Sequence, residues 1–137
     1  MTCLDLSLAA TPSNVRTARV AVGEAAAEHM QSDRLVDDVR LCVSEAVTNV
    51  VRHAYGTKRG AVQVVVERED GELVVAVRDD GMGLTASRRR GKSDGFGLKI
   101  IDKIATRHTI ASAPKTGTEI RMVFELEAAA LVDSPVA

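Results

Sequence analysis

A carboxylate and an amide, Glu45 and Asn49, lie four residues apart in a segment with helical periodicity. At about 100° per residue, this spacing places both side chains on one helix face, one turn apart. An amide oxygen is a hard ligand that suits Mg²⁺, and a carboxylate can accept a proton from an attacking hydroxyl. The pair is compatible with metal-assisted group transfer, but a solvated polar helix face would give the same pattern.

A second candidate site begins with Asp79, at the end of a valine-rich segment, and continues through Gly81 and Gly83. Glycines after a strand allow a sharp turn and a close approach of the backbone to a ligand. The aspartate can accept a hydrogen bond from an exocyclic amine such as that of adenine, and such a charge-assisted bond contributes about 1.5–3 kcal/mol. The alternative interpretation is an ordinary Asp-Gly turn.

A third candidate site is the glycine-rich start of a helix at Gly95, Gly97 and Leu98. Free backbone N–H groups and the helix dipole converge at such a start and can bind phosphate. The alternative is a hinge before the helix. The sequence contains neither the GxxxxGK[ST] loop nor a GxGxxG turn after the first strand, which argues against the usual P-loop and Rossmann sites.

Hydrophobic periodicity predicts three helices that would position these residues. The first begins at Ser13, the predicted N-cap, and the second opens at Ser32-Asp33 and ends near Tyr55-Gly56. The third is predicted over Phe96–Arg107. In the second helix, apolar residues form one side, and the opposite, exposed side is predicted to carry Glu45, Asn49, Arg52 and His53.

Two-residue periodicity predicts the strands of a sheet. These strands are Leu4–Leu8, Ala61–Arg68, Glu72–Asp79, His108–Ala111 and Thr118–Glu127. The last strand alternates apolar with mostly polar residues, so one face of the sheet is expected to be wet. We therefore predict an α+β fold, a two-layer α/β sandwich whose mostly antiparallel mixed sheet carries the helices on one face.

The length and composition suit one globular domain. We expect this domain to span residues 1–127, with a disordered tail over 128–137. Aromatic residues make up only 2% of the chain, which argues against the stacking platforms of single-stranded nucleic-acid binders. The formal net charge of −1 argues against direct nucleic-acid binding in general, because such proteins usually carry a basic excess.

The chain is expected to be cytoplasmic. No apolar stretch reaches the roughly 20 residues needed to span a bilayer, and Met1–Asp5 lacks the features of a signal peptide. Cys3 and Cys42 have no CxxC partner, so we expect two reduced thiols. The three histidines are too dispersed to predict a metal cluster.

Taken in order, the motifs resemble those of the GHKL, or Bergerat, ATPase family: E-x-x-x-N on a helix, D-x-G-x-G after a strand, G-x-G opening a helix, and Gly117-Thr118 starting a final strand. The resemblance covers roughly residues 32–126. Within the family, Val43–Asn49 followed by His53-Ala54-Tyr55, together with Ala18-Arg19-Val20, is similar to the bacterial anti-sigma-factor serine kinases. About a dozen residues before the first helix are too few for the phosphoacceptor hairpin of a sensor kinase.

The resemblance implies a role for each matching residue. Asn49 would coordinate Mg²⁺ bridging the ATP phosphates, Glu45 would act as the catalytic base toward a serine hydroxyl, and Asp79 would bind the adenine amine. The remaining implied roles are those of Gly81 and Gly83 in the adenine pocket, Gly95, Gly97 and Leu98 at the phosphates, Thr118 behind the adenine site, and Arg19 at the partner protein.

His53 and the segment between Gly83 and Gly95 each have two interpretations. His53 could contact the nucleotide or lie on the wet face of its helix. The segment corresponds to the ATP lid of the family, is short here, and carries Arg88–Arg90 and Lys92. These cations could neutralise the triphosphate or an acidic partner, or they could keep a solvated loop soluble.

The resemblance implies an ATP-binding anti-sigma factor with protein serine/threonine kinase activity. It would phosphorylate a STAS-type anti-anti-sigma factor, sequester a sigma factor and form a homodimer, with the open edge of Leu4–Leu8 as a pairing surface. The alternative is a regulatory module that binds ATP and sequesters a partner without phosphorylating it. The short lid favours this alternative, and the Glu45/Asn49 pair opposes it. An ATPase subunit of a repair or chaperone machine would need transducer domains that the sequence does not contain.

Overall fold

The computed structural model describes residues 1–82, 98–113 and 115–126 of the chain. Its elements follow in the order β1 (Thr2–Ala9), α1 (Pro12–Ala27), α2 (Asp33–Asn49), η1 (Val50–Ala54), β2 (Ala61–Glu69), β3 (Glu72–Asp79), α4 (Leu98–Ile104), β4 (Arg107–Ala113) and β5 (Gly117–Glu125). Three glycines of the predicted site, Gly83, Gly95 and Gly97, lie outside the described residues, as do the basic run and the predicted tail.

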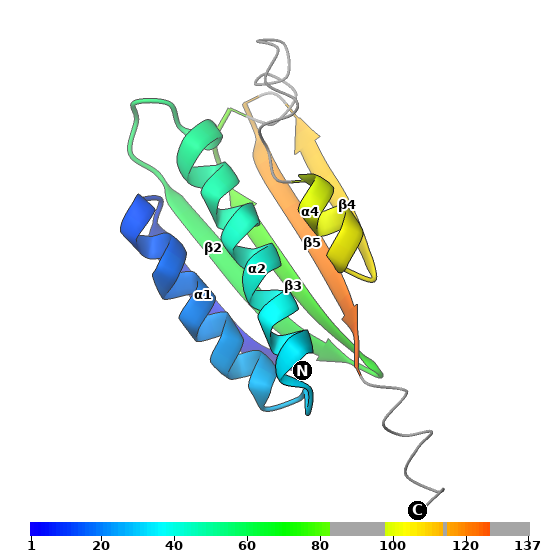
Figure 1. Ribbon diagram of the computed structural model, residues 1–137. Coiled ribbons are helices and arrows are strands. Elements are labelled where there is room, and N and C mark those ends of the chain that lie inside the picture. The colour runs from blue at the N-terminus through cyan, green and yellow to red at the C-terminus, as the bar shows by residue number, and fades with distance from the viewer. Residues whose placement is uncertain (83–97, 114, 127–137) are drawn as a thin grey trace, which may run out of the picture.

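The described strands form one sheet in the order β1-β2-β3-β5-β4, and α1, α2 and α4 cover one of its faces (Figure 1). This arrangement confirms the predicted two-layer α+β sandwich. Each neighbouring pair of described strands is antiparallel, so this sheet is not mixed. The register places Asp79 opposite both Val62 and Thr118, which brings two predicted site residues onto adjacent strands.

The core lies between the helices and the sheet and consists mainly of small aliphatic side chains. Valine alternates along β2, so Val62, Val64 and Val66 all point towards the helices and are fully buried. The buried helix residues opposite them include Ala18, Val22, Ala26, Val39, Val43, Ala46 and Val47. Because these side chains are short, the two layers can pack closely, and the chain fills its core with only 2% aromatic residues.

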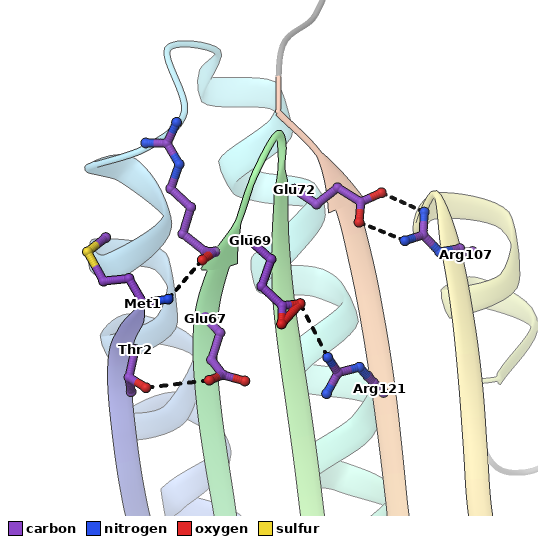
Figure 2. Close-up of polar contacts among 8 residues, drawn as sticks. Met1, Thr2, Glu67, Glu69, Glu72, Arg107 and Arg121 are labelled. Carbon is purple, nitrogen blue, oxygen red and sulfur yellow. Dashed lines mark hydrogen bonds and ion pairs between the residues drawn. The ribbon is translucent and has the colours of Figure 1, made fainter.

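The other face of the sheet carries charged side chains (Figure 2). Arg107 donates two hydrogen bonds to Glu72, of 2.6 and 2.7 Å, and Arg121 lies 3.5 Å from Glu69. Small aliphatic residues, at most 7% exposed, lie on this face among the long side chains: Val65, Val74, Ala76 and Val123. The face is therefore charged at its surface, as the alternation of the last strand predicts, with aliphatic residues beneath.

The start of α1 differs from the prediction. The helix begins at Pro12 and its N-cap is Thr11, not Ser13. Proline has a fixed φ that suits the first helical position and needs no N–H there, so the helix starts earlier than the hydroxyl of Ser13 suggests. Ser32 is the N-cap of α2, as predicted, and accepts a hydrogen bond from the backbone of Leu35 at 3.3 Å.

The third helix, predicted over Phe96–Arg107, ends before Arg107, and its predicted start at Phe96 lies outside the described residues. It is described from Leu98 and ends at Ile104. The helix ends there because the backbone N–H of Thr106 already donates a hydrogen bond of 2.9 Å to the carbonyl oxygen of Val123 on β5. Arg107 therefore opens β4 and does not close the helix.

Both cysteines are free thiols, as predicted. Cys42 lies on the inner side of α2, where burial, followed by the nearby carboxylates of Asp38 and Glu45, raises the pKa of its thiol to about 12. The thiol is therefore an unreactive core group. None of the described helices is long and apolar enough to cross a membrane.

Candidate functional site

The candidate site lies where α2 ends and continues as the π-helical turn η1. At the junction the backbone N–H of Val50 is shared between the carbonyl oxygens of Ala46 and Val47. The π-helical turn follows over Val50–Ala54, and single π-turns are frequent at functional sites. Gly56 follows with a φ of +60°, in agreement with the predicted end of the helical segment. The wider turn itself is not predicted, because no local sequence signal marks it.

Asn49, the last residue of α2, is only 8% exposed, which corrects its predicted place on the exposed helix side. The loop after β3 is tied to η1 by a hydrogen bond from Met82 N–H to the carbonyl oxygen of Ala54, of 2.7 Å. This contact brings another segment against the end of the helix, which helical periodicity alone cannot anticipate.

The Nδ2 atom of Asn49 is buried and has no hydrogen-bond partner among the described residues. A buried amide without a partner costs about 1–3 kcal/mol, so such groups are rare in folded proteins and call for an explanation. A polar ligand that accepts this hydrogen bond would remove the penalty. The amide oxygen of the same side chain is a suitable Mg²⁺ ligand, so the residue fits a site for a metal-bound anion.

Glu45 lies one helical turn before Asn49 and is half-buried. Its partial exposure leaves the carboxylate accessible to a reacting group, as a general base requires. His53 is half-buried within η1 and already takes part in an interaction within the protein. Its contact with a ligand stays a prediction.

Asp79 ends β3, and its carboxylate is held by backbone N–H groups. The N–H of Gly81 donates to Oδ1 at 2.8 Å, and the N–H of Thr118 donates to the same carboxylate. Burial raises the pKa of Asp79 above its usual value of 3.8, and these hydrogen bonds act in the opposite direction. A carboxylate has about four lone-pair sites, so this fixed group can still accept a hydrogen bond from a ligand amine.

Two glycines allow the chain to pack closely around Asp79. A Cβ atom at Gly81 would overlap the carbonyl oxygen of Ala54, and one at Gly117 would overlap the carbonyl oxygen of Asp79 itself. Gly117 also has a φ of +92°, which residues with side chains rarely adopt. The close approach at Gly81 is therefore made to the protein's own backbone, in addition to any approach to a ligand.

Thr118 lies opposite Asp79 in the β3–β5 pairing, and its hydroxyl oxygen is 2.9 Å from that of Ser112 on β4. Sequence reasoning missed Ser112. The only signal for it is its two-residue spacing from Ile110, which places both side chains on the same face of β4. An open hollow of about 640 Å³ runs along these strand ends and is lined in part by Asp79, Ser112 and Thr118. This volume is within the usual range of small-molecule sites.

The structure thus gathers the predicted residues of β3 and β5 at one end of the sheet and ties that end to η1. Glu45 and Asn49 occupy the two helical turns that lead into η1. Leu98 opens α4 and packs, half-buried, against the core. Arg19 is half-buried on α1, and its contact with a partner stays a prediction.

Comparison with known proteins adds an independent finding. Residues 8–124 match the family described as the histidine kinase-like ATPase domain. The chain is 33% identical to the anti-sigma F factor of Clostridium acetobutylicum over 87% of this chain and 90% of that protein. It is 28% identical to the anti-sigma F factor of Bacillus subtilis over 90% of this chain and 92% of that protein.

A solved structure of the RsbU and RsbW domains of a Mycobacterium tuberculosis protein has a similar fold. It superimposes with a TM-score of 0.69 at 24% sequence identity and covers 90% of this chain. The matched part is 32% of that longer chain. At this identity the likeness supports the fold alone.

Proposed function

The chain belongs to the histidine kinase-like ATPase domain family, and from this we propose that it is an ATP-binding anti-sigma factor with protein serine kinase activity. The observation that carries the proposal is the buried amide of Asn49, whose Nδ2 has no partner among the described residues and which lies in the helix that leads into η1. A triphosphate with its metal would supply the hydrogen-bond acceptor that this amide needs.

The two ends of the site suit the two ends of ATP. Asp79, held by the backbone of Gly81 and Thr118, would accept a hydrogen bond from the exocyclic amine of adenine. Asn49 would hold Mg²⁺ and the phosphates at the end of α2. When bound, Mg²⁺ would neutralise charge on the phosphate oxygens and orient them.

Glu45 would act on the protein substrate. A serine hydroxyl of the partner attacks the γ-phosphorus of ATP, and the carboxylate of Glu45 accepts the hydroxyl proton. The new serine O–P bond forms as the bond between the γ-phosphorus and the bridging oxygen breaks, and ADP leaves. Positioning and charge stabilisation would provide most of the rate enhancement, as is usual for phosphoryl transfer.

The anti-sigma F factors to which the chain is similar support a sigma factor as the sequestered partner. The phosphorylated substrate would be a STAS-type anti-anti-sigma factor, whose affinity for this protein would fall once its serine is modified. Sigma factors act on cytoplasmic RNA polymerase, so we propose that the protein works in the cytoplasm. The non-catalytic alternative shares the nucleotide and the sigma factor but lacks the transfer step.

The protein would act as a homodimer. The sheet face opposite the helices supports this proposal, because it carries charged side chains of both signs, such as Glu69 and Arg121 (Figure 2). The edge strand β1 is a second surface open to pairing.

The kinase is tested with Glu45→Gln, which keeps the size of the side chain and removes its basicity. With labelled ATP and STAS-domain proteins from the same genome, wild type should transfer phosphate. The variant should bind ATP equally well and transfer at least about 100-fold more slowly, the usual range for a lost general base.

Glu24→Gln, a matched change on the exposed surface of α1, should transfer normally. Unchanged transfer by Glu45→Gln would remove Glu45 from the mechanism, and no transfer by wild type to any STAS protein would favour the non-catalytic alternative.

A further inference from the structure

Tyr55, the first residue after η1, connects three segments through its hydroxyl group. The hydroxyl donates a hydrogen bond to the carbonyl oxygen of Ala61 at 2.6 Å and accepts one from the backbone N–H of Asp80 at 2.9 Å. Ala61 is the first residue of β2, and Asp80 directly follows β3. The hydroxyl therefore uses both its donor and an acceptor site, and it joins the end of η1 to two strands.

The contact with Asp80 acts on the Asp79 carboxylate. Asp80 lies between Asp79 and Gly81, the residue whose N–H holds Oδ1 at 2.8 Å. Fixing the N–H of Asp80 fixes the peptide that follows the Asp79 Cα, and so limits the directions in which the carboxylate can point. The bond from Met82 N–H to Ala54 O, of 2.7 Å, holds the far side of the same turn to η1.

The aromatic ring of Tyr55 lies over Gly60. A Cβ atom at Gly60 would overlap the ring atoms, so only glycine at this position leaves the ring where it is. Gly60 is itself anchored, because its carbonyl oxygen accepts a hydrogen bond from Ala10 N–H of 2.9 Å. The ring position is thus set by the backbone before β2, and the hydroxyl reaches Asp80 from there.

We propose that Tyr55 is a positioning residue for recognition of the nucleotide base. It holds the turn at residues 79–82 so that the Asp79 carboxylate faces the exocyclic amine of adenine. The proposal rests on the proposed function, since it assumes that Asp79 binds adenine, and it adds a residue that touches neither the base nor the phosphates. It predicts that loss of the hydroxyl affects the choice of base more than the binding of the phosphates.

Tyr55→Phe tests this directly, because it keeps the ring over Gly60 and removes only the hydroxyl. Affinities for ATP and for GTP, each with Mg²⁺, would be measured by competition against labelled ATP. Wild type should prefer ATP. The variant should lose about tenfold in ATP affinity, the scale of one hydrogen bond to a charged group, with little change for GTP. A purely structural role would lower both affinities alike, and an unchanged preference for ATP would overturn the proposal.

A second variant keeps the hydroxyl and moves it. Gly60→Ala should displace the ring and reproduce the loss of ATP preference, and adding it to Tyr55→Phe should cause no further loss. Gly71→Ala is the matched control, because a Cβ there meets nothing within 4 Å. The chain has one tyrosine and no tryptophan, so intrinsic fluorescence reports on Tyr55 alone and should change in Gly60→Ala but not in Gly71→Ala.

The outcomes separate this inference from the proposed function. If wild type binds neither nucleotide, the proposed function fails and the role of Tyr55 fails with it. If wild type prefers ATP and Gly60→Ala shifts the fluorescence without lowering that preference, ATP binding stands and the role of Tyr55 is overturned.

Discussion

At the scale of single residues, Asn49 and Asp79 show what a sequence pattern can and cannot give. Their spacing and context were enough to predict both as site residues. The burial of Asn49, which is only 8% exposed, could not be predicted, because helical periodicity does not show which other segments pack near the end of α2. The hydrogen bond between Tyr55 and Asp80 is likewise a product of tertiary contact and has no local signal.

Asp79 gives a prediction for pH dependence. Burial raises the pKa of Asp79 in the folded protein above 3.8. The carboxylate is therefore protonated, and ATP binding weakened, at a higher pH than would be the case for an ordinary carboxyl group. ATP affinity should fall as the pH drops through this raised pKa, because the charged acceptor is lost. Calorimetric titrations across the acidic range should show the fall in wild type and a flatter profile in Asp79→Asn.

The stability of the nucleotide-free protein should change in the opposite direction. Between 3.8 and the raised pKa of Asp79, the folded state binds more protons than the unfolded state, so this group favours folding more as the pH falls. The stability of Asp79→Asn relative to that of wild type should therefore be highest at neutral pH and should fall towards acid pH. A variant that is less stable than wild type by the same amount at every pH would contradict the raised pKa.

At the scale of elements, the hairpin of β2 and β3 was predicted almost to the residue, because alternating valines and the Asp70-Gly71 turn are both local signals. The predicted end of α4 was wrong, since the hydrogen bond between Thr106 and Val123 competes with extension of the helix. The π-turn η1 was missed, because no local sequence signal marks it. Local patterns thus identified the elements, and tertiary contacts decided their ends.

The turn between β4 and β5 provides a test at this scale. Gly117→Ala should destabilise the protein by about 2 kcal/mol or more, because φ is +92° and the added Cβ would overlap the carbonyl oxygen of Asp79. Urea unfolding measures the change, with Gly71→Ala as the unstrained control. Equal stabilities for the two variants would show that the strand ends are not packed as described.

At the scale of the whole molecule, the fold class was predictable because three amphipathic helices and five alternating strands leave few ways to bury one apolar face of each. The motif order added the family. What the pattern could not show is that the sheet face opposite the helices buries Val65, Val74 and Val123 beneath its charges. These valines become buried only when the neighbouring strands pair and place their long side chains around the valines.

The assembly can be measured directly. Sedimentation equilibrium should give about twice the chain mass of 14.6 kDa at micromolar concentration. A mass that stays at that of one chain throughout the concentration range would rule out the proposed homodimer.

The central claim, that the end of α2 and the strand ends together bind ATP, is tested most directly by calorimetric titration of ATP with and without Mg²⁺ into wild type and Asn49→Ala. We predict binding by wild type that depends on Mg²⁺. The variant should lose at least about tenfold in affinity, or 1.4 kcal/mol, and almost all of the Mg²⁺ dependence. Its own fold should lose little stability, because the amide it removes has no described partner. Absence of binding by folded wild type, or equal Mg²⁺-dependent binding by the variant, would contradict the account.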